Sequence, residues 1–275
     1  MKVDGWKYYN HAAITTTAPH EEPNLSAIED GSVWKVGEGK SPMFARWTTG
    51  FDCDCETTFW YIIKEGPFDI ETLATKARKH IRQSLKKVYV KKILVSEHLE
   101  ELCAVHNRAC QGYAEFNGSF VDETHFLNLN DSIECWGAFS SETDTLIGYM
   151  TCEQKNEYVE TISAKYDPNS LNLRPSDAIH FTILEYYLNE KGYKYVCSGT
   201  RSINHVTNAQ DYKISTFGFR KAFCRLHIVY NPKIRWMMKI IFPFRKILYA
   251  CDKIKFIHQF NAVLKMEALA RGKNE

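Results

Sequence analysis

The segment YVCSGTRSINHVTNAQDYKISTFGFRKAFCRLHIVYNP, residues Tyr195–Pro232, holds the densest set of structural signals in this chain. It begins with a β-type run at Tyr195 and Val196, continues through a polar turn and a short amphipathic stretch, and ends in a second β-type run, Ala222–Tyr230. Polar residues presented by loops between strands and helices commonly bind ligands or catalyse reactions. The segment therefore favours a catalytic α/β domain.

Three β-type runs joined by polar turns precede this segment and predict an antiparallel meander: Glu134–Phe139, Thr145–Glu153 and Tyr158–Tyr166. A helix is then predicted from Pro175, which suits a first helical turn, to Gly192, which suits the position after a helix. The first hundred residues predict strands and two helices, the second capped by Ser96: Val33–Val36, Met43–Thr49, Thr57–Lys64, Asp69–Lys87, Val88–Ile93 and 96–110.

The composition is that of a soluble globular protein. The 275 residues, 44% hydrophobic and 25% charged, are enough for one large domain or two small ones. Nine scattered cysteines, an odd number, do not resemble a secreted disulfide framework and favour a reducing cytoplasm. We see no signal peptide and no apolar run of about 18 residues, so we expect no membrane-spanning helix.

Basic residues are concentrated in two segments. Residues 69–92 hold eight Lys and Arg against two acidic residues, and residues 233–275 hold ten against three. This asymmetry suggests anionic partners such as phosphates, nucleic acid or lipid headgroups. Two solvated helix faces would explain it equally well.

The predicted order is helix, three strands, helix, strand, short helix, strand, and it resembles the GNAT acyltransferase fold. More narrowly it is similar to the Fem-type branch, which contains peptidyl and acyl transferases that act on cell-envelope precursors. Two stretches carry the likeness, ATKARKHIRQSLKKVYVKKI (Ala74–Ile93) and LEYYLNEKGYKYVCSGTRS…FGFRKAF (Leu184–Phe223). The resemblance covers residues 96–230 and is vaguer for residues 1–95.

The resemblance implies an α/β fold, with a mixed, mostly antiparallel central sheet flanked by helices. We expect a reduced N-terminal GNAT-like portion at residues 1–95, an acyltransferase domain at residues 96–232 and a basic helical tail at residues 233–275. The implied donor is acetyl-CoA or another acyl-CoA.

The chain departs from most acetyl-CoA enzymes of this superfamily before the long helix. Those enzymes carry an R/Q-x-x-G-x-G/A loop whose backbone N–H groups approach the pyrophosphate. The corresponding stretch here, Asn169–Ser176, reads NSLNLRPS and contains no glycine. Arg174 and the first-turn amides before Ser176 and Asp177 are left to bind a phosphate. Fem-type enzymes that use aminoacyl-tRNA also lack the loop, so tRNA is an alternative partner.

The polar cluster after the strand at Tyr195 is the predicted site: Arg201, Asn204, His205, Asn208, Gln210 and Asp211. His205 has the intrinsic pKa of a general base, and we expect Asn204 and Asp211 to act with it. Substrate- or donor-binding roles are expected for residues outside and inside this cluster: Arg174, Ser176, Arg201, Asn208, Gln210, Arg78 and Arg82. Helix capping by Asn and Asp is the competing explanation for the cluster.

No metal site is predicted, because Cys53-Asp54-Cys55 lacks the second Cys or His pair that zinc requires.

The tail carries apolar residues at helical spacing: Phe244, Ile247, Leu248, Cys251 and Ile254 on one stripe, and Trp236, Met237, Met238, Ile240, Ile241 and Phe242 before Pro243. Lysines and arginines surround both groups. Such a basic amphipathic pair can lie in the interface of an anionic membrane, or it can dock on the domain as a structural element.

We therefore expect an enzyme that transfers an acyl group to an amine, on a small-molecule or lipid-linked sugar or a cell-envelope glycan precursor. Its expected place is the cytoplasm, at the inner face of the membrane. The alternative from another class is a non-catalytic GNAT-like module that binds an anionic glycan, lipid or RNA.

Overall fold

A computed structural model describes residues 3–112, 120–203, 208–251 and 255–273 of the protein. The chain forms two compact units. The terminal unit comprises Met1–Tyr61, Thr200–Thr207 and Lys221–Glu275, and the central unit comprises Ile62–Gly199 and Asn208–Arg220. This division does not coincide with boundaries at residues 95 and 232, because strands from both ends of the chain pair with one another.

The central unit contains the expected meander. Its antiparallel strands are β5 (Val88–Ile93), β6 (Ile133–Ser140), β7 (Leu146–Gln154) and β8 (Tyr158–Tyr166). A fifth strand, β9 (Tyr195–Thr200), pairs in parallel with β8, which gives the order β9-β8-β7-β6-β5. The α/β class, with mostly antiparallel strands flanked by helices, is confirmed.

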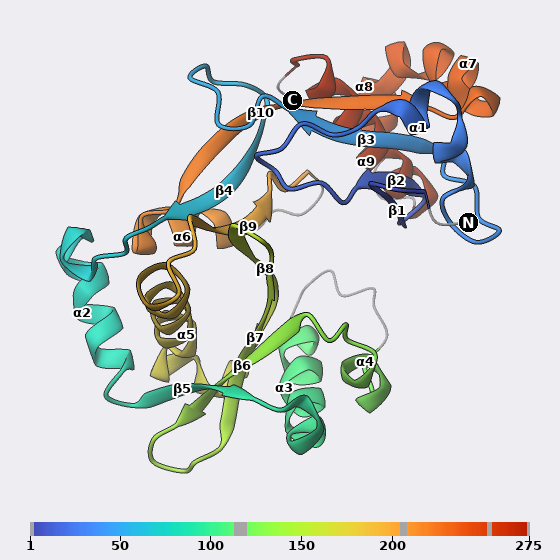
Figure 1. Ribbon diagram of the computed structural model, residues 1–275. Helices are drawn as coiled ribbons and strands as arrows, with labels where there is room; N and C mark the ends of the chain where they lie inside the picture. The colour runs from blue at the N-terminus through green and yellow to red at the C-terminus, as the bar shows by residue number, and fades with distance from the viewer. Residues whose placement is uncertain (1–2, 113–119, 204–207, 252–254, 274–275) are drawn as a thin grey trace. The chain divides into compact units, whose positions relative to one another are not determined.

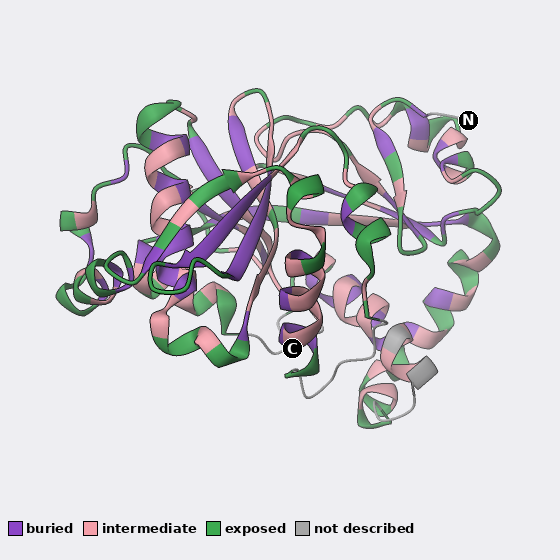
Figure 2. Ribbon diagram, turned by 90° about the horizontal axis from the view of Figure 1, so that it is seen from below, coloured by how far each residue is buried: buried purple, intermediate pink, exposed green. Residues whose placement is uncertain are grey.

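Helices cover both faces of this meander (Figure 1). Helix α3 (Leu99–Gln111) packs on β7 and β8, while α5 (Pro175–Leu184) packs on β5, β6 and β7. Successive side chains of β6 point to opposite faces of the sheet, so this strand contacts helices on both faces. Phe139 joins the core cluster of α3, whereas Trp136 donates a hydrogen bond of 3.0 Å to the hydroxyl of Tyr187, which follows α5 in the chain. Figure 2 shows the buried residues gathered on the strands and the inward helix faces.

Local signals set the ends of α5 and of the short helices. Arg174 before α5 adopts a left-handed conformation with φ of 60°, and Pro175 follows as the first helical residue. The helix continues as a π-helical segment, Glu185–Glu190, and Gly192 has φ of 71°. The remaining helices of the central unit are α2 (Thr75–Ser84), α4 (Glu123–Leu127) and α6 (Ala209–Phe217).

The terminal unit contains β1 (Trp6–Tyr9), β2 (Ala12–Thr15), β3 (Phe44–Thr49), β10 (Arg220–Tyr230) and the start of β4 (Phe59–Glu65), in the order β1-β2-β3-β10-β4. Strand β2 is parallel to β3, whereas β1 with β2 and β3 with β10 are antiparallel. A short helix, α1 (Ser26–Glu29), lies between β2 and β3 in the chain.

The C-terminal tail packs on the terminal unit. It forms α7 (Pro232–Ile241), a 3-10 turn (Phe242–Phe244), α8 (Arg245–Ala250) and α9 (Lys255–Ala270). Four tail residues share one core cluster with Phe44 and Tyr230: Met238, Phe242, Leu264 and Ala268. Among the described residues, no helix is both long and apolar enough to cross a membrane.

Three local expectations were wrong. Val33–Val36 is not a strand but lies in and just after a 3-10 helix, Ser32–Lys35, that follows Gly31. Residues 69–87 form a 3-10 turn, Ile70–Thr72, followed by α2, because Leu73 between them is extended. Ser96 lies in a 3-10 turn, Val95–Glu97, so α3 begins at Leu99 without a side-chain cap.

Candidate functional site

Strands β8 and β9 pair over three residues and then cease to pair. The paired residues are Tyr158 with Tyr195, Val159 with Val196, and Glu160 with Cys197, although β8 continues to Tyr166 and β9 to Thr200. At this point the Thr161 and Ser198 hydroxyls lie 2.8 Å apart. Backbone groups along a strand edge without a neighbouring strand need other partners, from water or a ligand. We call the place inside the central unit where this pairing ends the opening between β8 and β9.

Lys213 of α6 reaches this opening, where its ammonium group donates a hydrogen bond to the Ser198 hydroxyl. Burial lowers the pKa of Lys213, since a charged amine loses its hydration there. Within the described ranges, no carboxylate forms an ion pair with Lys213. A half-buried cation whose partner is a neutral hydroxyl is suited to attract negative charge on a ligand.

Asp177 anchors α6 to the first turn of α5. Its side chain is 2% exposed, and it accepts a hydrogen bond of 3.0 Å from the Arg174 guanidinium and another from the Tyr212 hydroxyl. Burial, together with the negative charge of Asp177, raises the pKa of Tyr212, so the phenol remains protonated and donates. This contact places Lys213, the next residue of α6, beside the same helix end.

His180 is a neutral member of this cluster. Its Nδ1 donates to the Ser176 carbonyl at 2.8 Å, which leaves Nε2 as an acceptor. Nε2 is buried and has no partner in the part of the chain that the structure describes. Burial, with a contribution from the Lys213 charge, lowers the pKa of His180 to about 3. The ring can accept a hydrogen bond but is too weak a base for proton abstraction near pH 7.

The structure brings two groups of predicted residues to one place. Arg174 and Ser176 lie at the start of α5, and Gln210 and Asp211 lie in the first turn of α6, which the Tyr212–Asp177 contact holds beside α5. Asn208 precedes α6 without forming a side-chain cap. The predicted base His205 and its neighbour Asn204 lie outside the described residues.

Arg201 belongs to the terminal unit, where it serves the fold. Its guanidinium donates to the Thr58 carbonyl at 2.6 Å and lies 4.6 Å from the centre of the Trp60 ring. Its backbone N–H also donates to the Trp60 carbonyl at 2.9 Å. A role in donor binding stays a prediction.

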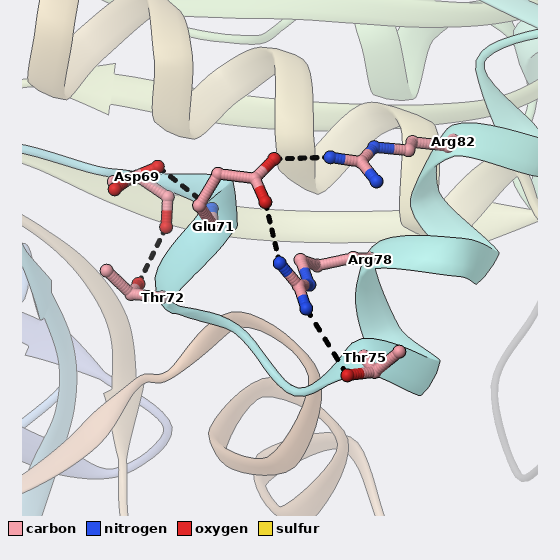
Figure 3. Close-up of polar contacts among 6 residues, drawn as sticks. All are labelled: Asp69, Glu71, Thr72, Thr75, Arg78 and Arg82. Atoms are coloured by element: carbon pink, nitrogen blue, oxygen red, sulfur yellow. Dashed lines mark hydrogen bonds and ion pairs between the residues drawn. The ribbon is translucent and has the colours of Figure 1, made fainter.

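Arg78 and Arg82 share one carboxylate, that of Glu71 (Figure 3). Arg78 contacts one carboxylate oxygen at 2.6 Å and also donates to the Thr75 hydroxyl at 3.3 Å, while Arg82 contacts the other oxygen. The expected basic row therefore exists on α2, but Glu71 already neutralises part of its charge. Together with Lys79 and Lys86, these two arginines line a surface cavity of about 400 Å³.

The first turn of α5 already contains a carboxylate. The preceding residues form a 3-10 helix, Pro168–Leu173, and the N–H groups of Asp177 and Ala178 donate to the Arg174 carbonyl at 3.0 and 3.4 Å. The Asp177 carboxylate occupies the end of the helix that attracts anions. Phosphate binding by Arg174 and the first-turn amides stays a prediction, and Arg174 would have to exchange its ion pair with Asp177 for the phosphate.

No metal centre is found within the ranges that the structure describes, since no group of three potential ligands is close enough to hold an ion.

The comparisons with known proteins concern the fold. No protein-family model matches the sequence, and no curated protein matches it either. The crystal structure of FemX is similar over 86% of this chain and 85% of that chain, with a TM-score of 0.58 and 8% identity. The chain therefore has a GNAT-like fold, similar to that of FemX.

More distant likenesses are found to lysylphosphatidylglycerol synthetases. The C-terminal domain of a putative one from Agrobacterium fabrum is 11% identical, with a TM-score of 0.49 over 86% of this chain and 83% of that chain. L-PGS from Bacillus licheniformis is also 11% identical, with a TM-score of 0.47 over 82% and 79%.

Six residues of the candidate site were not predicted from the sequence: Thr161, Asp177, His180, Ser198, Tyr212 and Lys213. One signal was available. Asp177 and His180 interrupt the otherwise apolar face of PSDAIHFTIL, and polar residues at the spacing of one helical turn on a buried face must find partners. Lys213 carries no comparable signal, because its neighbours in α6 are mixed in character.

Proposed function

We propose that this protein is an acyltransferase that joins an acyl group to an amine, and that the reaction takes place where β8 separates from β9. The observation that carries this proposal is the Lys213 ammonium, held on the Ser198 hydroxyl at that opening without a carboxylate partner among the described residues. Attack of an amine on an ester or thioester places negative charge on the carbonyl oxygen. Collapse of this intermediate forms the amide, breaks the C–S or C–O bond and releases the thiol or alcohol, while the amine gives up its proton. A preorganised, desolvated cation stabilises that charge in the transition state.

The surrounding groups would position the substrates. Beyond Glu160, β8 has no pairing with β9 among the described residues, and the backbone N–H and C=O groups of residues 162–164 would be available to a donor that contains amides, as a peptide does when it extends a sheet. The Thr161 and Ser198 hydroxyls orient the Lys213 ammonium. The buried Nε2 of His180 can accept a hydrogen bond from a substrate N–H. His205 remains the sequence-based prediction for the base.

Two classes of acyl donor are compatible with the proposed reaction. Acetyl-CoA or another acyl-CoA is the donor that the superfamily resemblance implies. The Asp177 carboxylate at the start of α5 favours a second class, an activated acyl ester such as aminoacyl-tRNA, whose phosphates need not approach that helix end. The proposed acceptor is an amine on a small-molecule or lipid-linked sugar, or on a cell-envelope glycan precursor.

The test compares Lys213→Met with Lys194→Met, a matched control whose lysine is exposed and paired with Glu157. Purified protein is titrated with acetyl-CoA and, separately, with tRNA charged with labelled amino acids. Transfer of the acyl group to glucosamine, an amino sugar of the proposed acceptor class, is then measured with the donor that binds, after subtraction of the rate without protein. Because removing a transition-state donor costs on the order of 100-fold or more in rate, Lys213→Met should be severely impaired and Lys194→Met should not.

The melting temperature shows whether a variant has lost catalysis alone or has lost its fold. Methionine replaces a desolvated cation by an apolar chain of similar length, so the melting temperature of Lys213→Met should be unchanged or higher. Equal transfer by both variants would overturn the role of Lys213. If neither donor binds and no transfer occurs, the protein is a non-catalytic GNAT-like module.

A further inference from the structure

Four large apolar side chains are exposed along α7, the 3-10 turn and α8. They are Trp236, Ile240, Phe244 and Ile247, which are 65%, 57%, 59% and 64% exposed. Their spacings of four, four and three residues place them on one side of a nearly continuous helical segment. We call these four residues, with the lysines and arginines described next, the α7–α8 surface.

The opposite side of the same segment already fills the core. Met238 and Phe242 are buried with Leu264 and Ala268, and Leu248 packs against that cluster. The expected stripe through Phe244, Ile247 and Leu248 is therefore divided, and its last member, Ile254, lies outside the described residues. Because the fold uses only the inward side, the outward apolar residues contribute little to it.

The charge of this segment has one sign. Residues 233–250 contain Lys233, Arg235, Lys239, Arg245 and Lys246 and no acidic residue. Four of these cations are exposed: Lys233, Arg235, Lys239 and Lys246. In the described ranges none of the four forms an ion pair with a carboxylate. Spacings of four and seven residues place Arg235, Lys239 and Lys246 along one flank of the apolar side.

The combination of exposed apolar side chains and exposed cations favours one class of partner over the others. A nucleic acid would engage the cations but would leave Ile240 and Ile247 exposed, and an apolar helix would gain nothing from the cations. An anionic lipid surface uses both, because apolar side chains enter below the headgroups while lysine and arginine stems extend to the phosphates. Tryptophan suits the same boundary, since its ring is apolar and its N–H is polar. We infer that the α7–α8 surface binds this protein peripherally to an anionic membrane.

Point substitutions are needed to test this inference. Deleting residues 233–275 would remove Met238, Phe242, Leu264 and Ala268 from the core and would confound binding with unfolding. The full chain is instead tested as two double variants, Trp236→Ser with Phe244→Ser, and Lys239→Gln with Lys246→Gln. The matched controls change exposed residues of the central unit: Leu94→Ser with Leu171→Ser, and Lys191→Gln with Lys194→Gln.

Binding is measured by co-sedimentation with phosphatidylcholine vesicles that contain or lack phosphatidylserine. The wild type and both controls should bind the anionic vesicles and bind the neutral ones weakly. Each cation removed should weaken binding about fivefold, so Lys239→Gln with Lys246→Gln should lose about 25-fold. The apolar double variant should lose at least tenfold. All five proteins should unfold at closely similar temperatures.

Three outcomes would overturn the inference: a wild type that fails to bind anionic vesicles, an apolar double variant that binds like the wild type, or equal losses in the controls. Binding of single-stranded RNA that depends on Lys239 and Lys246 but not on Trp236 and Phe244, without vesicle binding, would identify a nucleic acid as the partner instead. The result does not depend on the proposed function, because transfer to a soluble acceptor should be unchanged in the two α7–α8 variants.

Discussion

Asp177 joins two helices of the central unit through one buried carboxylate. Its oxygens accept hydrogen bonds from Arg174, three residues before it, and from Tyr212, thirty-five residues after it. Removing a buried acceptor leaves the donors around it without a partner, which costs more than the hydrogen bonds contribute when formed. This residue therefore holds the candidate site together without touching the opening itself.

Asp177→Ala should lower the free energy of unfolding by roughly 3 kcal/mol, because it leaves Tyr212 and the half-exposed Arg174 unpaired. Asp211→Ala is the matched control, since Asp211 is exposed on α6 and its removal should cost less than about 1 kcal/mol. Urea denaturation followed by circular dichroism measures both. Equal values for the two variants would contradict the anchoring role.

His180 should make stability depend on pH. Its pKa is lowered from 6.5 to about 3 in the folded state by burial, so between these values the unfolded chain binds a proton that the folded protein excludes. The free energy of unfolding should thus fall as the pH drops below 6.5, by up to about 1.4 kcal/mol per pH unit.

His180→Asn should flatten this dependence, because asparagine keeps a donor for the Ser176 carbonyl and does not titrate. Part of the slope should remain, since burial also lowers the pKa of His106, to about 4. Urea denaturation between pH 4 and pH 7 measures both slopes. Identical slopes in the variant and the wild type would show that His180 does not govern the acid sensitivity.

Helix α2 presents a basic face whose charge is limited by one residue from the preceding turn. Glu71 contacts both Arg78 and Arg82 from its position in the 3-10 turn, as Figure 3 shows. Such exposed ion pairs contribute little to stability. Their larger consequence is for binding, because a phosphate that approaches α2 must compete with this carboxylate.

Glu71→Gln should therefore strengthen binding of uncharged tRNA by about fivefold while leaving the melting temperature within a few degrees of the wild type. Glu97→Gln, at another exposed 3-10 turn of the central unit, is the control for the change in net charge. Filter binding over a series of salt concentrations provides the measurement. No difference between the two variants would show that α2 takes no part in anion binding.

Helix α9 completes the core of the terminal unit from the far end of the chain. Leu264 and Ala268 are fully buried against Phe44 of β3, and the Tyr230 hydroxyl donates to Glu267 at 2.9 Å. The tail is thus part of a domain that also contains the first residues of the chain, rather than an appendage.

Deleting residues 255–275 should expose this cluster and destabilise the terminal unit. Tryptophan fluorescence reports on it selectively, because the central unit holds Trp136 alone and the other five tryptophans lie in the terminal unit. The emission should shift to longer wavelength, whereas deletion of residues 272–275, beyond α9, should leave it unchanged. Unaltered emission in the longer deletion would refute the structural role of α9.

Local sequence signals correctly predicted those strands and helices that depend mainly on their own residues. Runs of β-type residues joined by polar turns predicted the meander, and Pro175 predicted the start of α5, because strand propensity and the missing proline N–H act within one element. The strand predicted at Val33–Val36 was wrong because strand formation also needs a partner. Its apolar residues suit a strand, but none of the described strands pairs with it, and the chain forms a 3-10 helix after Gly31.

The candidate site depends on contacts between residues far apart in the chain. The sequence alone placed Arg174, Ser176, Gln210 and Asp211 in two separate segments, and nothing local indicated that Tyr212 would reach Asp177 or that Lys213 would reach Ser198. The end of pairing between β8 and β9 is likewise a property of two strands, since β8 continues to Tyr166 and β9 to Thr200 although they pair only as far as Glu160 and Cys197.

In the C-terminal tail, too, the sequence determined some features and the tertiary structure decided others. Composition and helical spacing by themselves determined that residues 233–250 form basic helices with apolar residues on more than one side. Only the tertiary structure decided which apolar residues are buried, Met238 and Phe242, and which remain exposed, Trp236 and Phe244. The reason is that helical periodicity records only how hydrophobic each side is, whereas the shape of the core cluster around Phe44 and Leu264 selects the side that packs.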